Sequence, residues 1–462
     1  MMSTSAESVS APQPRLSAAQ IVARIERLPF TRFHLKARLI IGTATFFDAF
    51  DALAIAYVLP VLIPLWRLGP TDIGTLISVG YVGQIVGALF FGWFAERKGR
   101  MPSLLLSVAT YSVFALLAAF AWDYTSLLVF RTLQGVGLGG EVPVAATYIN
   151  EISKARGRGR FVLLYELVFA IGLFCAALVG YWVVPNWGWR ALFVIGALPA
   201  LLIVAIRLLL PESPRWLADR GRLAEADAVV SDIEREAVRE TGAPLPPPIE
   251  APAVASRATR WQELLQGIYR RRTLVVWVVW FSTYFATYGV STWLPSLYTS
   301  VFRLPLEEAL RYSLIVTGCS IPAGFVCAVL IDRTGRKRWI TGALLLGGLL
   351  FVGLWLAGAS SALQVLLFAT AAGMCFNTVA LALYLYSPEI YPTRMRALAS
   401  SVGSAWLRVA SALGPIVVGF VVAGYSLATA FLVFGVVLIL GAAITALYGT
   451  ETKGRVLEDI SP

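Results

Sequence analysis

Two carboxylates, Asp48 and Asp51, lie in an otherwise apolar run, IIGTATFFDAFDALAIAYVLPVLIPLW, at residues 40–66. A carboxylate at bilayer depth costs roughly 2.5–3.5 kcal/mol on insertion scales, so such residues are rare and usually functional. Because they are three residues apart, the two side chains would share one face of a helix. At a rise of 1.5 Å per residue, Asp48 would lie ~15 Å into the span, near the midplane. The pair predicts a site for a proton or another cation inside the membrane.

The composition is that of a polytopic membrane protein. The chain has 462 residues, of which 58% are hydrophobic and 14% are charged, whereas soluble domains carry roughly 25% charge. The net charge of +11 comes from basic residues in short loops between apolar segments. This is the distribution that orients membrane helices, so we expect no nucleic-acid partner.

Twelve apolar segments are long enough to cross a bilayer, which takes about 20 residues. They are residues 38–66, 73–95, 102–121, 125–149, 161–184, 189–210, 273–300, 311–331, 338–358, 361–387, 398–423 and 427–449. Lys and Arg cluster before the first span and in loops 2–3, 4–5, 8–9 and 10–11, whereas loops 3–4, 9–10 and 11–12 have none. The positive-inside rule therefore predicts that both termini are cytoplasmic.

The expected fold class is an all-α membrane protein with two six-helix bundles. We divide the chain into a cytoplasmic N-terminal segment (1–37), an N-terminal bundle (38–210), a cytoplasmic linker with short helices (211–272), a C-terminal bundle (273–449) and a cytoplasmic tail (450–462). The linker joins a charged stretch of helical spacing to a proline-rich breaker. It is either a spacer or a docking site.

The two halves repeat each other. GWFAERKGRM at 92–101 corresponds to AVLIDRTGRK at 328–337, an offset of 236 residues. Glu151-Ile152-x-x-x-Arg156-x-Arg158 corresponds to Glu389-Ile390-x-x-x-Arg394-x-Arg396, an offset of 238. Parallel repeats of this kind place the substrate site at the interface between the halves.

At these residues the chain resembles the major facilitator superfamily. Gly92-x-x-x-Glu96-Arg97-x-Gly99-Arg100 matches the family's loop 2–3 signature, and Asp332-Arg333-x-Gly335-Arg336-Lys337 matches its second copy. Two positions depart from the pattern: Met101 replaces a basic residue, and Ala328 replaces the leading glycine of the second copy. The resemblance implies a secondary transporter that works by alternating access.

Further motifs resemble particular branches. The segments Pro211-Glu212-Ser213-Pro214-Arg215-Trp216-Leu217 and Glu451-Thr452-Lys453-Gly454 look like the sugar-porter and organic-ion-transporter group. Asp48-Ala-Phe-Asp51 resembles an element of aromatic-acid:proton symporters, and Gly139-Gly140-Glu141-Val142-Pro143 is similar to niacin transporters. These motifs imply an aromatic carboxylate substrate and a bacterial inner-membrane location.

Arg131 in the fourth span is the expected partner of the acids in the first span, because the resembled sugar porters pair a span-1 acid with a span-4 arginine. Burial raises the pKa of a carboxyl group and a nearby arginine lowers it, so a balanced site can load and release a proton. We expect protonation of Asp48 or Asp51 to free Arg131; a static buried ion pair is the alternative. Glu141 is a further proton-coupling candidate.

Arg408, about ten residues into the eleventh span, either binds a substrate carboxylate through its planar guanidinium or pairs with an internal acid. In the seventh span, positions 277, 281, 284 and 288 share a helical face that lies toward either a cavity or lipid. The substrate-binding candidates are Arg408, Trp280, Tyr284, Tyr288, Gln134, Asn377 and Tyr384.

Charged residues at the cytoplasmic ends of the helices are expected to form a gate. Isolated exposed pairs contribute ~0–1 kcal/mol, but a network can hold a bistable interface. The alternative is that these charges only orient the helices. The gating candidates are Glu96, Arg97, Arg100, Glu151, Arg156, Glu166, Glu212, Arg215, Asp332, Arg333, Glu389 and Arg394.

The sequence thus predicts a monomeric, proton-coupled importer of a small organic acid such as nicotinate. We expect no enzymatic activity, cofactor or metal site, because there is neither a nucleophile–base set nor a metal-ligand cluster, and the single histidine precedes the first span. A sugar or organic-cation facilitator or exchanger of the same fold is the alternative. A non-transporting substrate sensor is a third possibility.

Overall fold

A computed structural model describes residues 17–153, 158–248 and 261–453. For residues 158–167 and for 393, 394, 397, 400 and 401 only the backbone is described. In the described residues all regular elements are helices. This agrees with the all-α class expected from the long apolar runs.

The helices follow the chain in one continuous order. They are α1 (Ala18–Arg27), α2 (Arg32–Trp66), α3 (Pro70–Lys98), α4 (Arg100–Ala119), α5 (Tyr124–Ile152), α6 (Arg158–Trp187), α7 (Trp189–Gly196), α8 (Ala200–Leu209), α9 (Pro214–Asp219), α10 (Leu223–Thr241), the 3₁₀ helix η1 (Trp261–Leu265), α11 (Gly267–Ser291), α12 (Leu294–Ser300), α13 (Leu306–Thr334), α14 (Arg336–Leu356), α15 (Ala362–Glu389), α16 (Thr393–Gly424) and α17 (Leu427–Tyr448).

Each of the twelve predicted spans corresponds to a helix or a helix pair. Eleven segments in the described part of the chain are long and apolar enough to cross a membrane. The twelfth is α5, a helix of 29 residues that is more polar because it carries Arg131, Gln134 and Glu141. Two of the spans are broken, one between α7 and α8 near Pro199 and one between α11 and α12 near Pro295. A proline cannot donate the backbone hydrogen bond that a continuous helix needs at that position.

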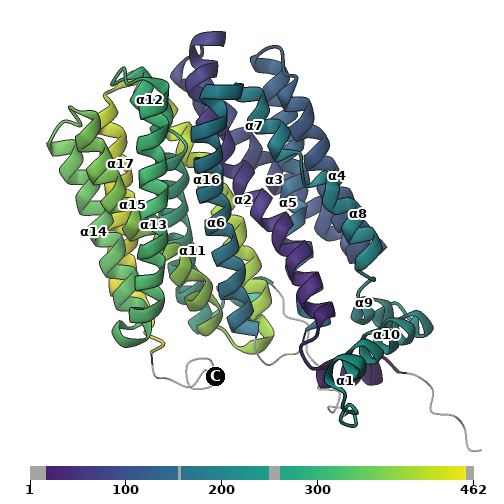
Figure 1. The fold of residues 1–462 in the computed structure, drawn as a ribbon. Coiled ribbons are helices and arrows are strands. Elements are labelled where there is room, and N and C mark those ends of the chain that lie inside the picture. The colour runs from purple at the N-terminus through teal and green to yellow at the C-terminus, as the bar shows by residue number, and fades with distance from the viewer. Residues whose placement is uncertain (1–16, 154–157, 249–260, 454–462) are drawn as a thin grey trace, which may run out of the picture.

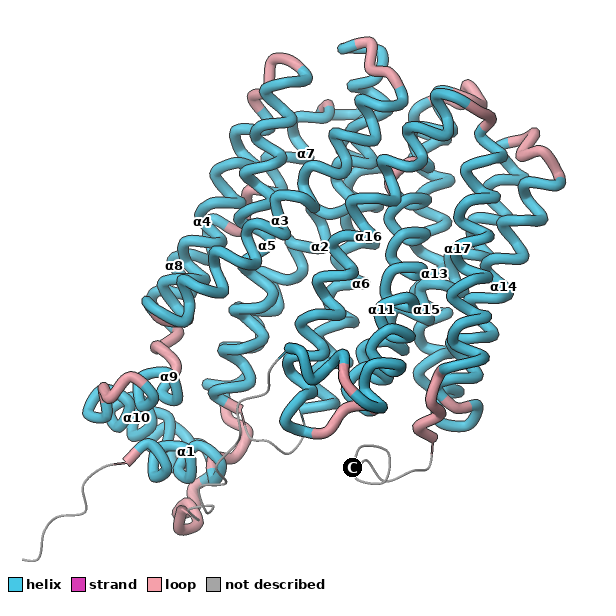
Figure 2. Tube along the Cα trace, turned by 180° about the vertical axis from the view of Figure 1, so that it is seen from behind, coloured by secondary structure: helices cyan, strands magenta, loops and turns pink. Residues whose placement is uncertain are grey.

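The helices form two bundles, α2–α8 and α11–α17, which lie on the right and on the left of Figure 1. We call the interface between them the seam. It is made mainly by α3 with α16, α6 with α13, and α2 with α12. Figure 2 shows from behind that α6 and α16 lie in the middle of the molecule. Residues on α2, α3 and α6 of the first bundle and on α12, α13 and α16 of the second therefore form most of the seam.

The helices α1, α9 and α10 form a small cap at one end of the first bundle, seen at the bottom of Figure 1. Ile21 and Ile25 of α1 pack on Trp216 of α9 and Val230 of α10. Beside these apolar contacts, two arginines of α1, Arg24 and Arg27, donate hydrogen bonds to the carboxylate of Glu234 on α10. We call the end of the molecule that carries this cap the linker face, and the opposite end the far face. The sequence did not predict α1.

Glycines allow α3 and α5 to approach closely. An added Cβ at Gly87 would lie 2.0 Å from the carbonyl oxygen of Val136, and one at Gly135 would lie 2.1 Å from that of Gly80. Such contacts exclude any side chain and match the small-residue packing of membrane helices. Because of this packing, Arg131 of α5 projects into the interior of the first bundle.

Candidate functional site

Asp51 and Arg131 form a buried ion pair between α2 and α5. Asp51 is 3% exposed and Arg131 is 4% exposed. Nη1 of Arg131 donates to both carboxylate oxygens of Asp51 at 2.8 Å. The amide of Gln134 donates to Oδ1 of Asp51 at 2.6 Å, and its carbonyl oxygen accepts from Nη1 of Arg131 at 3.0 Å. The expected partnership of Arg131 with a span-1 acid is thus present, and Asp51 is the partner.

Asp51 and Arg131 also line a small cavity between α2, α3 and α5. Tyr81 and Gln84 of α3 complete its wall. The cavity has room for about one water molecule. Gln134, expected at the substrate, is instead fully buried and bonded to the ion pair.

Asp48 lies one turn before Asp51, and in the described residues its carboxylate forms no ion pair. It is 8% exposed, and the charges of Arg408 and Asp51 act on it. Arg408 belongs to α16 of the second bundle, so this interaction crosses the seam. Nε of Arg408 is buried and has no hydrogen-bond partner in the described residues. Asp48 and Arg408 thus face the same region without closing into an ion pair.

Glu141 of α5 is completely buried in the first bundle. The hydroxyl of Thr45 on α2 donates to Oε1 of Glu141 at 3.4 Å, whereas Oε2 has no partner in the described residues. The charge of Asp48 also acts on Glu141. Three carboxyl groups, those of Asp48, Asp51 and Glu141, are therefore buried near one another.

Aromatic rings form a ladder along α11 and cross the seam. Trp280 stacks on Tyr284 at 5.4 Å between ring centroids, and Tyr284 stacks on Tyr288 at 6.1 Å. Tyr288 then meets Tyr81 of the first bundle at 5.1 Å. Trp280 also lies 3.0 Å from the position of an added Cβ at Gly403, five residues before Arg408 on α16. The ladder thus packs against α16 about one and a half turns before Arg408 along that helix.

Of the remaining substrate-binding candidates, Tyr384 contacts the aromatic ladder and Asn377 lies inside the second bundle. The aromatic residues of the predicted stripe do not act as one face, because Trp277 and Phe281 pack against Trp406 of α16. Tyr384 of α15 meets the edge of the ladder at Trp280, 5.1 Å between centroids. Asn377 donates to the carbonyl oxygen of Ser320 at 3.2 Å, a contact between α15 and α13 inside the second bundle.

The seam is closed near the far face. The hydroxyl of Ser78 on α3 donates to the carbonyl oxygen of Ala412 on α16 at 2.6 Å. The hydroxyl of Tyr181 on α6 donates to Glu307 on α13 at 3.2 Å. An added Cβ at Gly74 would lie 2.7 Å from the carbonyl oxygen of Pro415. Backbones from the two bundles are therefore in direct contact at this end.

At the linker face the ion pairs of the described residues stay within one bundle or join the cap. Arg100 pairs with Glu151 at 2.8 Å and with Glu96 at 2.9 Å. The second bundle repeats the arrangement, because Arg336 pairs with Glu389 at 3.1 Å and with Asp332 at 2.6 Å. The predicted gate thus consists, in this conformation, of two separate and equivalent clusters.

Each cluster also contains a glutamate that accepts a hydrogen bond from the first backbone N–H of a helix, α4 in the first bundle and α14 in the second. Glu212 accepts from the backbone N–H of Arg100 at 2.9 Å, and Glu451 accepts from that of Arg336 at 2.9 Å. Burial raises the pKa of Glu212, although its backbone hydrogen bonds and Arg100 act in the opposite direction. Glu451 was not among the predicted site residues, but its offset of 239 from Glu212 is the same signal that revealed the repeat.

The other gating candidates are dispersed. Arg97 lies over the ring of Trp93 at 4.5 Å, and Arg333 is exposed. Arg215 bonds to Glu26 of the cap helix α1 at 2.7 Å. The side chains of Glu166 and Arg394, and the whole of Arg156, fall outside the described residues. Tyr81, which carries the ladder across the seam, was missed because nothing in its sequence surroundings distinguishes it.

Comparison with known proteins places this geometry in a family. Residues 67–462 match the family model described as "Sugar (and other) transporter". The niacin transporter NiaP of Acinetobacter baylyi is 36% identical over 443 residues, which cover 95% of this chain and 99% of that protein. A putative niacin/nicotinamide transporter NiaP of Bacillus subtilis is 30% identical over 90% of this chain and 96% of its own.

Solved structures agree on the fold. The xylose transporter XylE from E. coli, in a partially occluded inward-open conformation, superposes with a TM-score of 0.70 at 19% identity. The match covers 92% of this chain and all of that structure. The fold is thus what the chain shares with this structure. The chain belongs to the sugar (and other) transporter family of the major facilitator superfamily, and it is a multi-pass membrane transporter.

Proposed function

We propose that the protein couples the entry of protons to the uptake of a small aromatic carboxylate such as nicotinate. The observation that carries the proposal is the set of groups around the seam: Asp48 opposite Arg408, Asp51 paired with Arg131, and an aromatic ladder beside them. The similarity to niacin transporters supports the choice of nicotinate.

Coupling would use the difference between the two span-1 acids. Asp51 is held by two hydrogen bonds from Arg131 and one from Gln134, whereas Asp48 has no ion-pair partner in the described residues. Ionisable groups inside a transporter are candidate proton carriers by default. A proton arriving at Asp51 would remove the charge that holds Arg131, and α2 and α5 would then be free to shift relative to each other.

Substrate binding would use the second bundle. A carboxylate accepts two parallel hydrogen bonds from a guanidinium, which makes Arg408 the natural anchor for an organic acid. Tyr284 and Tyr288 would stack on the ring, since offset aromatic pairs contribute about 0.5–1.5 kcal/mol beyond their buried area. The charge of Arg408 acts on Asp48, so a bound substrate carboxylate would compete with that acid for the guanidinium.

The far-face contacts support an inward-facing assignment for this conformation, with the linker face toward the cytoplasm. The basic residues of the sequence concentrate at the linker face, as the positive-inside rule expects. We therefore place the protein in a bacterial inner membrane, as a monomer with both termini cytoplasmic.

Uptake of labelled nicotinate into proteoliposomes, with and without an inward pH gradient, tests the proposal. Nicotinate, benzoates, hexoses and quaternary amines would be compared as competitors. An Arg408→Lys variant keeps the charge but loses the planar fork, so the KM for nicotinate should rise. An unchanged KM in that variant would remove Arg408 from substrate binding.

An organic-cation exchanger is the second candidate. It is favoured by the carboxylate of Asp48, which is at the seam and has no ion-pair partner in the described residues. In that case quaternary amines would compete and benzoates would not, and an Asp48→Asn variant would lose binding of the amine.

A further inference from the structure

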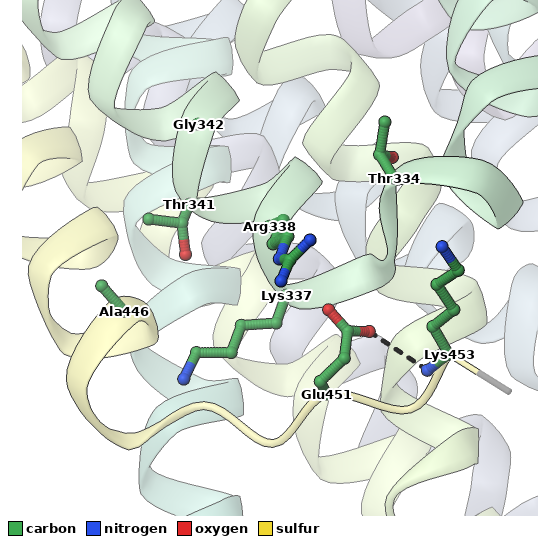
Figure 3. Close-up of a pocket in the computed structure, with 8 residues that line it drawn as sticks. All are labelled: Thr334, Lys337, Arg338, Thr341, Gly342, Ala446, Glu451 and Lys453. Carbon is green, nitrogen blue, oxygen red and sulfur yellow. Dashed lines mark hydrogen bonds between the residues drawn. The ribbon is translucent and has the colours of Figure 1, made fainter. Parts of the chain in front are cut away.

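A cavity of about 700 Å³ opens at the linker face of the second bundle, away from the seam site. It lies between the start of α14 and the segment that follows α17 (Figure 3). Its lining consists of Thr334, Lys337, Arg338, Thr341, Gly342, Ala446, Glu451 and Lys453. Neither the proposed coupling nor the aromatic ladder uses any of these side chains.

The cavity is cationic. Three basic residues, Lys337, Arg338 and Lys453, line it together with one acid, Glu451. Oε1 of that acid accepts from the backbone N–H groups of Arg336, Thr452 and Lys453 at 2.9–3.1 Å, and its buried Oε2 has no hydrogen-bond partner in the described residues, so a single carboxylate stands against three cations. In the described residues Lys337 and Arg338 form no ion pair. Positive charge is therefore left available toward the opening.

The internal repeat shows that the charge cluster does not require these cations. Arg336 corresponds to Arg100, and each is held by a helix-capping glutamate and two acidic partners. The positions after Arg336 are Lys337 and Arg338, whereas those after Arg100 are Met101 and Pro102. The first bundle builds the same network without basic residues there. Lys337 keeps the basic residue of the repeated signature that Met101 replaces, and Arg338 follows it, so in this chain only the second bundle has basic residues at these two positions.

The basic opening continues into an apolar surface. Gly342, Leu345 and Leu349 follow Arg338 along one face of α14, at spacings of three and four residues. On the adjacent helix α17, Leu440 is 56% exposed and Leu447 is 72% exposed. These leucines belong to helices long and apolar enough to span the membrane, and exposed apolar side chains there meet lipid chains. A cationic opening with leucines above it complements a charged headgroup with its acyl chains.

We propose that this cavity binds the phosphate-bearing headgroup of an anionic phospholipid. Lys337, Arg338 and the hydroxyl of Thr341 would receive the phosphate. The hydroxyl oxygen of Thr341 is buried and has no hydrogen-bond partner in the described residues. Basic pockets between membrane helices are the places where anionic lipids are recognised. The acyl chains distinguish this ligand from free phosphate, which would use only the polar half of the site.

The test is a thermal-shift titration of the purified full chain with phosphatidylglycerol, phosphatidylcholine and inorganic phosphate. The K337Q/R338Q variant should lower the apparent affinity for phosphatidylglycerol about tenfold or more. The matched control, R270Q/R271Q, removes two exposed charges at the linker end of α11 and should stay within about twofold of the wild type. Phosphatidylcholine and inorganic phosphate should not stabilise any form at the same concentrations.

A steric variant tests the cavity without a change of charge. An added Cβ at Gly342 meets nothing within 4 Å, so a leucine there fits the fold and occupies the opening. G342L should therefore keep its melting temperature without lipid and lose the response to phosphatidylglycerol. Removal of residues 454–462, which contain Glu458 and Asp459, should leave lipid affinity unchanged.

Four results would overturn the proposal. They are an unchanged affinity in both K337Q/R338Q and G342L, an equal loss in R270Q/R271Q, equal protection by inorganic phosphate, or a tenfold gain in lipid affinity on removal of the tail. The last result would assign the cavity to the acidic tail of the chain itself.

Discussion

Replacing Gly419 with alanine should weaken the closure of the seam at the far face. Gly419 lies on α16, where an added Cβ would be 2.6 Å from the carbonyl oxygen of Pro70 on α3. That oxygen belongs to the backbone of the other bundle, so no side-chain rotation relieves the overlap. The two helices must separate, and the conformation that opens at the far face is relieved of the clash.

The size of the effect follows from the overlap. Ordinary contacts of a Cβ begin at 3.4 Å, so the backbones must separate by about 0.8 Å at this point. Overpacking of this kind costs roughly 1–3 kcal/mol. If this cost raises the free energy of only one of two conformations, the ratio of their populations changes about 5- to 150-fold.

Maleimide labelling of a cysteine at position 78 measures the shift. Ser78 is 1% exposed and bonds across the seam, so S78C reacts only when the far face opens. In a background without the four native cysteines, G419A should label about 5- to 150-fold faster than the parent.

The control is G424A on the same helix, where an added Cβ meets nothing within 4 Å, and it should label at the parental rate. If G419A also labels at the parental rate, the far-face contact does not hold the seam closed and the reasoning fails.

Three further predictions concern the ion pair, the cap and the ladder. Asp51→Asn alone should cost about 3–5 kcal/mol of unfolding free energy because Arg131 is left unpaired, and the double variant with Arg131→Gln should recover most of it in thermal unfolding; a loss in the double variant equal to the sum of the two single losses would mean that the pair is not coupled. Burial acts to raise the pKa of Glu234, but its two arginine partners lower it below the ordinary 4.5. The stabilisation of the fold by these ion pairs is therefore complete above pH 4.5 and is lost as the pH falls through the lowered pKa. Glu234→Gln should likewise speed hydrogen exchange in α1 about tenfold, as measured by mass spectrometry, while the exposed control Glu225→Gln has little effect; equal effects of the two would refute the role of Glu234. Tyr288→Leu should raise the KM for an aromatic substrate about 2- to 10-fold in uptake assays, and Tyr288→Phe should not; equal KM values for the two variants would exclude stacking.

The fold was largely predictable because membrane helices are dictated by length and hydropathy. Apolar runs of about 20 residues can satisfy their backbone in lipid only as helices, so the crossings could be located from composition alone. The same reasoning could not find α1, whose burial depends on contacts with α9 and α10 more than 180 residues away in the chain. Its amphipathic pattern covers only ten residues, and the partner surface is not visible in the sequence.

Buried charged residues of the site could be predicted from the sequence, whereas the choice between neighbouring side chains, which depends on how the helices pack, could not. An arginine and acids inside apolar spans must find partners, and the resemblance to sugar porters indicated Arg131 as the partner of a span-1 acid. Which of the two acids would pair was not predictable, because Asp48 and Asp51 differ by one turn and only the helix positions distinguish them. The ladder along Trp280, Tyr284 and Tyr288 has a spacing of four, whereas the expected face began at Trp277, which packs against Trp406 instead.

The central claim is that the acids of α2 carry the protons that drive transport. The most direct test compares D48N and D51N with the wild type in proteoliposomes, measuring both uptake driven by a pH gradient and exchange of substrate without a gradient. We predict that at least one variant loses driven uptake and retains exchange. Driven uptake at the wild-type rate in both variants would contradict the claim.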